Sequence, residues 1–268
     1  MDIHKPKPWH GAREFLKEYL IIVVGVLTAL GAEQMVEAFH WSEKVRHAEA
    51  REAPEIAGIY ADAYERDVVQ PCIDRRIDDL KAALLTGAGE WKPIPLMVMT
   101  GVSGRDSVLV TPNRVWADQG WQTLVADGTA SHLSPARQLI YGGIFAQTQA
   151  LRARHVLEIG EISAFNLLRN RTMLSWPERN DMVLRLEQEK TRNDGMATNA
   201  RQLMVTIAKL GPPDTKAADR QLLNRSGTYR ACYFAGFLPP GSRPPADLTP
   251  EDRRLLGVAP SAPAPPKH

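Results

Sequence analysis

Cys72 and Cys232 are the only cysteines in this chain of 268 residues, and two thiols can form one disulfide. Such a bond forms in an oxidising compartment, outside the cytoplasm. The loop between the two residues is long, so the chain-entropy model predicts a stabilisation of about 4 to 5 kcal/mol. Two unpaired buried thiols, which pack as small apolar groups, are the alternative. The chain has no Cys-x-x-Cys pair and therefore does not resemble a redox enzyme.

Glutamate and histidine occur together at two places with a spacing that can bind metal. Glu37-x-x-His40 has the order and spacing that di-iron bundles use twice, whereas His155-x-x-Glu158 has the reverse order. Helices rich in these residues produce such pairs by chance. We expect a solvated face, on which Glu43 and His47 form an i,i+4 pair. The sequence therefore predicts no metal site.

No other pattern predicts a catalytic residue or a cofactor. The phosphate-binding patterns GxxxxGK[ST] and GxGxxG do not occur, and no serine stands in a nucleophile elbow. Trp116, Trp121 and Tyr141 are candidates for lining a pocket, but aromatic residues at helical spacing more often belong to a core. The net charge of +2, without a block of Lys or Arg, argues against a nucleic-acid partner.

The first structural element that the sequence indicates is an uncharged apolar run, Tyr19 to Ala32. About fourteen residues give roughly 21 Å of helix, which is short for a hydrocarbon core of roughly 30 Å. Apolar flanks that begin at Phe15 and end at Phe39 lengthen the run. We predict a transmembrane helix over residues 15–39. A cleaved signal peptide and a buried helix of a soluble protein are the alternatives.

Small residues lie one turn apart inside this run: Gly25, Thr28, Ala29 and Ala32. In lipid, small residues allow two helices to approach closely. The predicted partners are therefore the lipid bilayer and, through these four residues, a second copy of the chain or another membrane subunit. A lone helix with ordinary small residues is the alternative.

Basic residues flank the run on both sides, with a slight excess before it. The positive-inside rule then places the amino terminus in the cytoplasm and the bulk of the chain outside. The four basic residues before the run are Lys5, Lys7, Arg13 and Lys17, and the three after it are Lys44, Arg46 and Arg51.

The segment KEYLIIVVGVLTALGAEQMVE, followed by Trp41, resembles the start of a family of uncharacterised bacterial membrane-anchored proteins, and QPCIDRRIDDL at 70–80 is similar as well. The resemblance implies a short basic head, one transmembrane helix and a helical extracytoplasmic domain. It thereby implies a bacterial inner membrane with a periplasmic domain. It implies no catalytic residues.

Proline, glycine and apolar spacing divide the rest of the chain into expected helices. Pro54 is expected to end the first of these helices, Pro71 to interrupt the next one, and Gly195 to break a later one. The expected helices cover about 11–53, 55–70, 72–86, 112–127, 135–169, 176–210 and 215–224. Residues 88–110 read as a loop with short strands at 96–102 and 107–110.

The predicted fold is all-α: an N-terminal transmembrane helix that continues into an antiparallel helical bundle, with a Pro-rich C-terminal tail. The expected parts are a basic cytoplasmic head at 1–14, the transmembrane helix at 15–39, a helical extracytoplasmic domain at 40–238 and a largely irregular tail at 239–268. Within the tail, Thr249-Pro250-Glu251-Asp252 predicts a short helix.

Two classes of function fit this sequence. The first is a non-enzymatic interaction, scaffold or accessory subunit in the cell envelope, and it is the one we expect. The second is an anchored enzyme or ligand-binding sensor whose site is built from scattered residues. A pocket with convergent polar groups of perturbed pKa would favour the second. A filled core and an exposed apolar patch would favour the first.

Overall fold

The computed structural model describes residues 11–86, 90–91, 107–165, 168–169 and 171–246. These residues are mostly helical and contain no strand, which confirms the all-α class. The helices in chain order are α1 (Ala12–Thr86), α2 (Gln119–Ala126), the short 3-10 helix η1 (Thr129–His132), α3 (Pro135–Phe165), α4 (Trp176–Ala208), α5 (Thr215–Arg225) and α6 (Gly227–Phe234).

Helix α1 is a single helix of 75 residues that passes through both Pro54 and Pro71. The expected interruptions at these prolines are therefore wrong. A proline inside a helix removes one backbone hydrogen bond and costs roughly 3 kcal/mol. Residues on either side of each proline pack against the bundle, and this tertiary packing offsets that cost and keeps the helix continuous.

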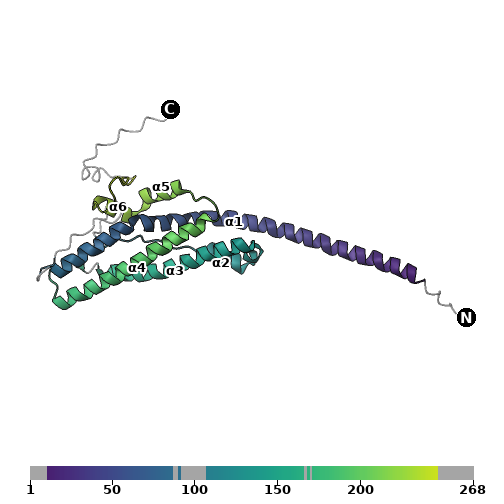
Figure 1. The fold of residues 1–268 in the computed structure, drawn as a ribbon, viewed down its shortest axis with the longest axis horizontal. Coiled ribbons are helices and arrows are strands. Elements are labelled where there is room, and N and C mark those ends of the chain that lie inside the picture. Colours follow the sequence, from purple (N-terminus) through teal and green to yellow (C-terminus); the bar gives the residue numbers. More distant parts are fainter. Residues whose placement is uncertain (1–10, 87–89, 92–106, 166–167, 170, 247–268) are drawn as a thin grey trace, which may run out of the picture.

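Three long helices form the bundle (Figure 1). α1 and α3 run in the same direction, and α4 runs antiparallel to both and contacts both. α5 and α6 pack on the far side of α1. The first half of α1 projects from the bundle as a free rod, so one helix forms both the projection and a bundle wall.

Several expected elements differ from the observed ones. Residues 111–118 are extended, and the helix expected from 112 begins only at Gln119. The extended segment is held from outside, because the Arg152 guanidinium donates to the Trp116 carbonyl at 2.8 Å. α4 continues through Gly195, no strand forms at 107–110, and α6 was not expected from the sequence. The strand expected at 96–102 and the helix at 249–252 lie outside the described residues.

The bundle core consists of two apolar clusters that follow each other along its axis. The cluster near the projecting rod includes Ile59, Ala63, Trp116, Tyr141, Phe145, Leu151, Met196, Ala200 and Leu203. The far cluster includes Val69, Ile73, Ile77, Trp91, Phe165, Leu186, Leu222 and Tyr229. Trp116 and Tyr141 are thus core residues, and Trp121 packs against this core, as expected.

The disulfide Cys72–Cys232 is present, with Cα atoms 5.9 Å apart across 160 residues of sequence. It links α1 to α6 at the level of the far cluster. Both residues are buried. The bond therefore joins the last helix of the domain to the helix that carries the rod.

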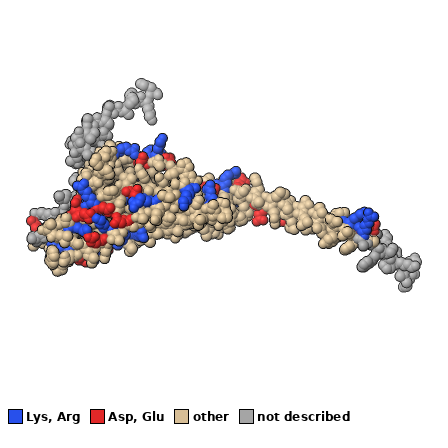
Figure 2. Space-filling model, viewed as in Figure 1, with Lys and Arg blue, Asp and Glu red and all other residues tan. Residues whose placement is uncertain are grey.

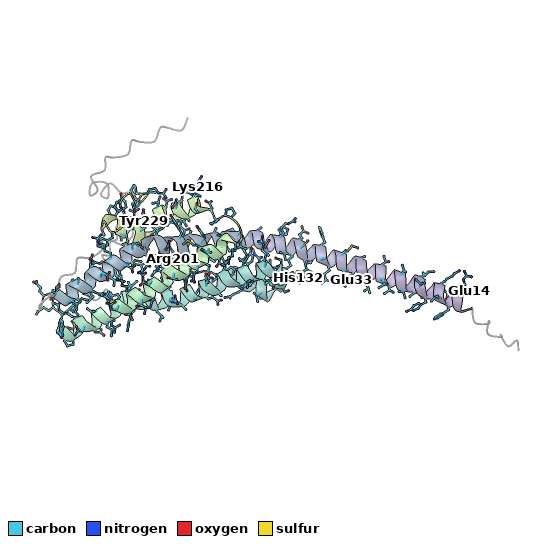
Figure 3. All side chains as sticks on the ribbon, in the orientation of Figure 1. Glu14, Glu33, His132, Arg201, Lys216 and Tyr229 are labelled. Atoms are coloured by element: carbon cyan, nitrogen blue, oxygen red, sulfur yellow. A yellow bond between two sulfur atoms is a disulfide. The ribbon has the colours of Figure 1, made fainter. Side chains whose placement is uncertain are left out.

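Within the described residues, α1 is the one helix whose length and composition suffice to cross a membrane. The large apolar side chains from Phe15 to Phe39 are exposed on its rod. In Figure 2 the rod is largely uncharged between charged groups at its amino-terminal end and the bundle. Glu14 and Glu33 lie on the rod, whereas His132 lies where the bundle begins (Figure 3).

A small aromatic contact closes the bundle against α1 just beyond the rod. The His132 ring stacks on the Trp41 ring with centroids 3.6 Å apart. The Lys44 ammonium lies 4.6 Å from the Trp41 ring centre and 3.7 Å from the Asp127 carboxylate. This contact fixes the α2–η1 end of the bundle beside the apolar rod.

Candidate functional site

A layer of buried polar side chains separates the two apolar clusters. Arg66 lies on α1 between Ala63 of one cluster and Val69 of the other. Its Nη2 donates to Glu158 Oε1 of α3 at 2.7 Å and also to Asn193 Oδ1 of α4. Arg66 is 1% exposed and Glu158 is fully buried. One guanidinium thus joins all three long helices.

Two hydrogen-bonding atoms of Arg66, Nε and Nη1, have no partner within the described residues. A buried donor without a partner costs free energy, since water no longer solvates it. The layer is therefore only partly satisfied. Such a layer is a place where the bundle can bind a small polar group or change its packing.

His155 completes the α3 side of this layer. Its Nδ1 lies 3.0 Å from Glu158 Oε2, and its Nε2 lies 3.2 Å from Asn113 Oδ1. Burial alone would raise the pKa of Glu158, but the His155 hydrogen bond and the Arg66 charge outweigh it and lower that pKa. His155 and Glu158, the pair with the reverse order in the sequence, therefore lie in the core.

Glu189 of α4 is a second fully buried carboxyl in the same layer. Burial, together with the negative charge of Glu158, raises its pKa to about 7, although Arg192 and Arg66 act in the opposite direction. Arg192 donates to its Oε2, whereas its Oε1 has no partner within the described residues. Glu189 therefore titrates near neutral pH.

Asp62, another carboxyl with a raised pKa, lies on α1 one turn before Arg66. Burial raises the pKa of Asp62 to about 6, while the nearby Arg114 lowers it in part. Gln221 of α5 donates to Asp62 Oδ1 at 2.9 Å. Two acidic groups of the bundle, Glu189 and Asp62, therefore titrate near neutral pH.

The first Glu–His group behaves as expected. His47 lies 3.8 Å from Glu43 on an exposed helix face, and Glu37 accepts a hydrogen bond from the Trp41 indole at 3.4 Å. No cluster of His, Cys, Asp or Glu within the described residues has a geometry that could hold a metal ion. The four small residues of the rod, Gly25, Thr28, Ala29 and Ala32, are exposed, and their role in helix packing stays a prediction.

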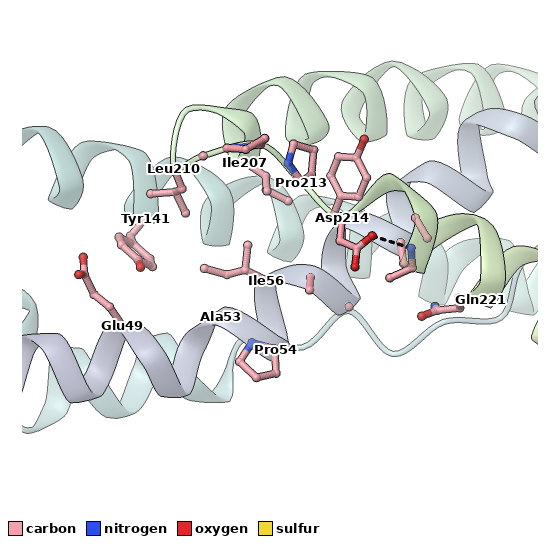
Figure 4. A pocket seen from close by; sticks show the side chains of 18 of the residues that line it. Glu49, Ala53, Pro54, Ile56, Tyr141, Ile207, Leu210, Pro213, Asp214 and Gln221 are labelled. Atoms are coloured by element: carbon pink, nitrogen blue, oxygen red, sulfur yellow. Dashed lines mark hydrogen bonds between the residues drawn. The ribbon is translucent and has the colours of Figure 1, made fainter.

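A trough of about 600 Å³ lies between α1, the start of α3 and the turn from α4 to α5. Its floor and walls are mostly apolar (Figure 4). Its polar lining includes Glu49 at one end and Gln221 at the other (Figure 4), and Arg137 pairs with Glu49. Tyr141 lines it, but Trp116 and Trp121 do not. Of the three aromatic residues considered for a pocket, Tyr141 is therefore the one that lines this trough.

Comparisons with protein families, curated proteins and solved structures found no significant match to this chain. Functional assignment therefore depends on the side chains described above.

Sequence patterns missed Arg66, Glu189 and Asn193. All three occupy core positions of their helices: Arg66 continues the spacing of Ile59 and Ala63, and Glu189 and Asn193 that of Leu186 and Met196. A charged or amide residue at an otherwise apolar helical position was the signal that could have identified the layer.

Proposed function

We propose that this protein is a single-pass, membrane-anchored helical protein of the cell envelope that acts by interaction rather than catalysis, as a scaffold or accessory subunit. The outward face of α3 is the observation that carries the proposal. The continuous helix from the apolar rod into the bundle supports the anchor, and the disulfide is compatible with a periplasmic domain.

The outward face of α3 carries no charged residue over about six turns, roughly 32 Å. Its exposed residues are Leu139, Ala146, Ala150, Ala153, Leu157 and Gly160. Leu139 is 79% exposed and Leu157 is 60% exposed. A solvent-facing helix surface normally carries charged or polar side chains, so this face is typical of a surface that another helix covers.

The charged residues of α3 point away from this face. Four of them form ion pairs with other elements: Arg137 with Glu49, Arg152 with Asp118, Glu158 with Arg66, and Glu161 with Arg185. Arg154 extends over Gly195 of α4. α3 therefore does not lack charged residues: four of them form ion pairs with other elements, and the fifth, Arg154, lies over α4.

Alanine and glycine along this face leave little side chain between α3 and anything that lies on it. Helix axes can come closer where the contacting side chains are small. The partner expected from this chemistry is an apolar, small-residue helix of another envelope subunit. Such a contact would be weakened by any charge placed in its middle.

Ala150→Arg tests the proposal, since it places a cation at the centre of the face without touching the core. The full chain is purified from membranes after mild cross-linking, and co-purifying proteins are identified and quantified. We expect the main partner to fall at least tenfold. Ala83→Arg, an exposed alanine on α1 outside the face, should change nothing. An unchanged partner set in Ala150→Arg would contradict the proposal.

A ligand-binding sensor is the second candidate, and two observations favour it. The trough has the size of a small-molecule site. Glu189 and Asp62 titrate near neutral pH inside the bundle. Retained partner binding in Ala150→Arg together with loss of function in trough variants would favour the sensor over the scaffold.

A further inference from the structure

We infer that the trough binds the acyl chain of a single-chain amphiphile whose zwitterionic head rests on Glu49 and Arg137. This inference rests on the membrane anchor of the proposed function. It concerns a site that the α3 face does not include.

Small residues of α1 create the trough. Ala53, Ala57, Gly58 and Ala61 all line it. A Cβ placed on Gly58 would meet no atom within 4 Å. A glycine in the middle of a helix weakens that helix relative to alanine, and it leaves room for another group to approach the backbone closely.

The walls suit a hydrocarbon chain. Ile56, Tyr141 and Ile207 are buried and give the trough an apolar inner surface. The lining extends along α1 from Glu49 to Ala61, roughly 18 Å at the helical rise. A volume of about 600 Å³ over this length leaves a mean cross-section of roughly 30 Å², which is narrow and suits an extended chain better than a fused-ring ligand.

Two polar side chains of the trough, Asp214 and Gln221, already have partners within the protein. The Asp214 carboxylate accepts the Ala217 backbone N–H at 2.9 Å and caps α5. Gln221 donates to Asp62. The Tyr60 hydroxyl is one further polar group in the lining. Because the rest of this lining is mostly apolar, the part of the ligand that lies there is expected to be apolar.

The remaining polar pair lies at the end of the trough that faces the rod. Arg137 Nη1 and Glu49 Oε1 are 2.9 Å apart, and their side chains are 42% and 28% exposed. One cation beside one anion matches a zwitterionic head, which carries both charges. A purely anionic head would have to compete with Glu49 for Arg137.

The trough is expected to lie close to the membrane, which would be the source of the ligand. Glu49 follows Phe39, the last apolar residue of the rod, by ten residues, or about 15 Å of helix. Polar headgroup regions occupy roughly 5 to 7 Å on each side of the hydrocarbon core. The open end of the trough therefore stands just above the headgroups, where a single-chain lipid that leaves the bilayer meets it first.

Photo-cross-linking tests the site. The full chain is placed in lipid nanodiscs with a lysophosphatidylcholine that carries a diazirine on its acyl chain, and labelled peptides are mapped by mass spectrometry. We expect labelling of 49–61 and 207–221 in addition to the rod. Gly58→Trp should reduce trough labelling at least tenfold and leave rod labelling unchanged. Ala83→Trp, exposed on α1 beyond the trough, is the matched control.

Ala57→Leu is a milder filling variant in case Gly58→Trp disturbs the helix, and far-ultraviolet circular dichroism checks both. Labelling confined to the rod, or trough labelling that is equal in both filling variants and the wild type, overturns the inference. A fatty acid of the same chain length should compete more weakly than the unlabelled lysolipid. Glu49→Gln should reduce the difference in competition between the lysolipid and the fatty acid. A fatty acid that competes with wild type as well as the lysolipid, or better, would contradict the zwitterionic head.

Different results would contradict the membrane anchor and the ligand-binding trough. A protein that stays in carbonate-washed membranes but shows no trough labelling contradicts this inference alone. A protein that carbonate releases contradicts the anchor and, with it, the membrane as the source of the ligand.

Discussion

Arg66 and Glu158 meet at 2.7 Å in the layer that separates the two apolar clusters of the bundle, and both side chains are buried. A buried ion pair gains little net stability, because desolvation costs nearly as much as the pair returns. Its stronger effect is on register, since the charges match only when α1 and α3 align at this level. The pair thus sets the position of the bundle on the helix that carries the rod.

Arg66→Met should destabilise the domain by about 3 to 5 kcal/mol, because it leaves the Glu158 charge buried without its main partner. The double variant Arg66→Met/Glu158→Met should recover at least half of that loss. Urea unfolding of the full chain in detergent, followed by circular dichroism, measures both. Arg201→Met breaks the exposed pair with Asp67 on the same bundle and should cost less than about 1 kcal/mol. Equal losses in the buried and exposed variants would contradict this account.

The raised pKa of Glu189 predicts that the bundle becomes more stable as pH falls from about 8 to 5. Its pKa is raised from 4.5 to about 7 in the folded state, so the folded state binds a proton in this window that the unfolded state does not. The contribution is at most roughly 3 kcal/mol, present below the unfolded pKa and lost as pH rises through 7.

Glu189→Gln should therefore raise the melting temperature at pH 8 and flatten its dependence on pH between 5 and 7. Glu187→Gln, an exposed glutamate on the same helix that pairs with Lys81, is the control and should keep the wild-type slope. The Asp62 carboxyl, with a pKa near 6, supplies the slope that remains. A wild-type slope in Glu189→Gln would show that Glu189 does not titrate in this range.

Much of the fold was predictable because local patterns agreed with the tertiary structure. α3 begins at Pro135 and α4 at Trp176, where serine caps and proline mark helix starts. α4 carries a complete capping box between Ser175 and Glu178. Such signals act within a few residues and do not depend on the rest of the chain.

The errors arose where distant contacts override a local preference. Pro54 and Pro71 do not end α1, because the packing of α1 against α4 exceeds the cost of each proline. Residues 111–118 do not form a helix, because α1 and α3 supply their hydrogen bonds. The candidate sites were missed for the same reason: Arg66, Glu158 and Asn193 come from three helices and meet only in the folded bundle.

Reduction of Cys72–Cys232 should lower stability by about 5 kcal/mol in the chain-entropy model, given the 160-residue separation. Cys72→Ser/Cys232→Ser should reproduce the effect and become insensitive to reductant. Unfolding midpoints with and without reductant measure the loss. Thiol labelling of denatured, non-reduced protein from cells should find few free cysteines. Full labelling at both positions would mean that the bond does not form in the native compartment.

The rod predicts integral membrane attachment, because its apolar side chains have no protein cover. The full chain should remain in carbonate-washed membranes. A charged residue near the middle of a transmembrane helix costs roughly 2.5 to 3.5 kcal/mol for insertion. Val24→Arg/Leu27→Arg should therefore shift a large fraction to the supernatant, whereas Ala83→Arg should not. Release of the wild-type chain would contradict the anchor.

The charge bias and the disulfide favour the same predicted orientation. Basic residues before the rod slightly outnumber those after it, which favours a cytoplasmic amino terminus. A disulfide in the domain after the rod is compatible with an oxidising periplasm. A reporter fused after His268 that works only outside the cytoplasm should therefore be active. Lys5, Lys7, Arg13 and Lys17 changed together to Gln should reduce that activity, because the remaining basic residues then lie after the rod. If a reporter that works only in the cytoplasm is active at the same position, the predicted topology is wrong. Cys72 and Cys232 would then lie in a reducing compartment and be expected to be reduced.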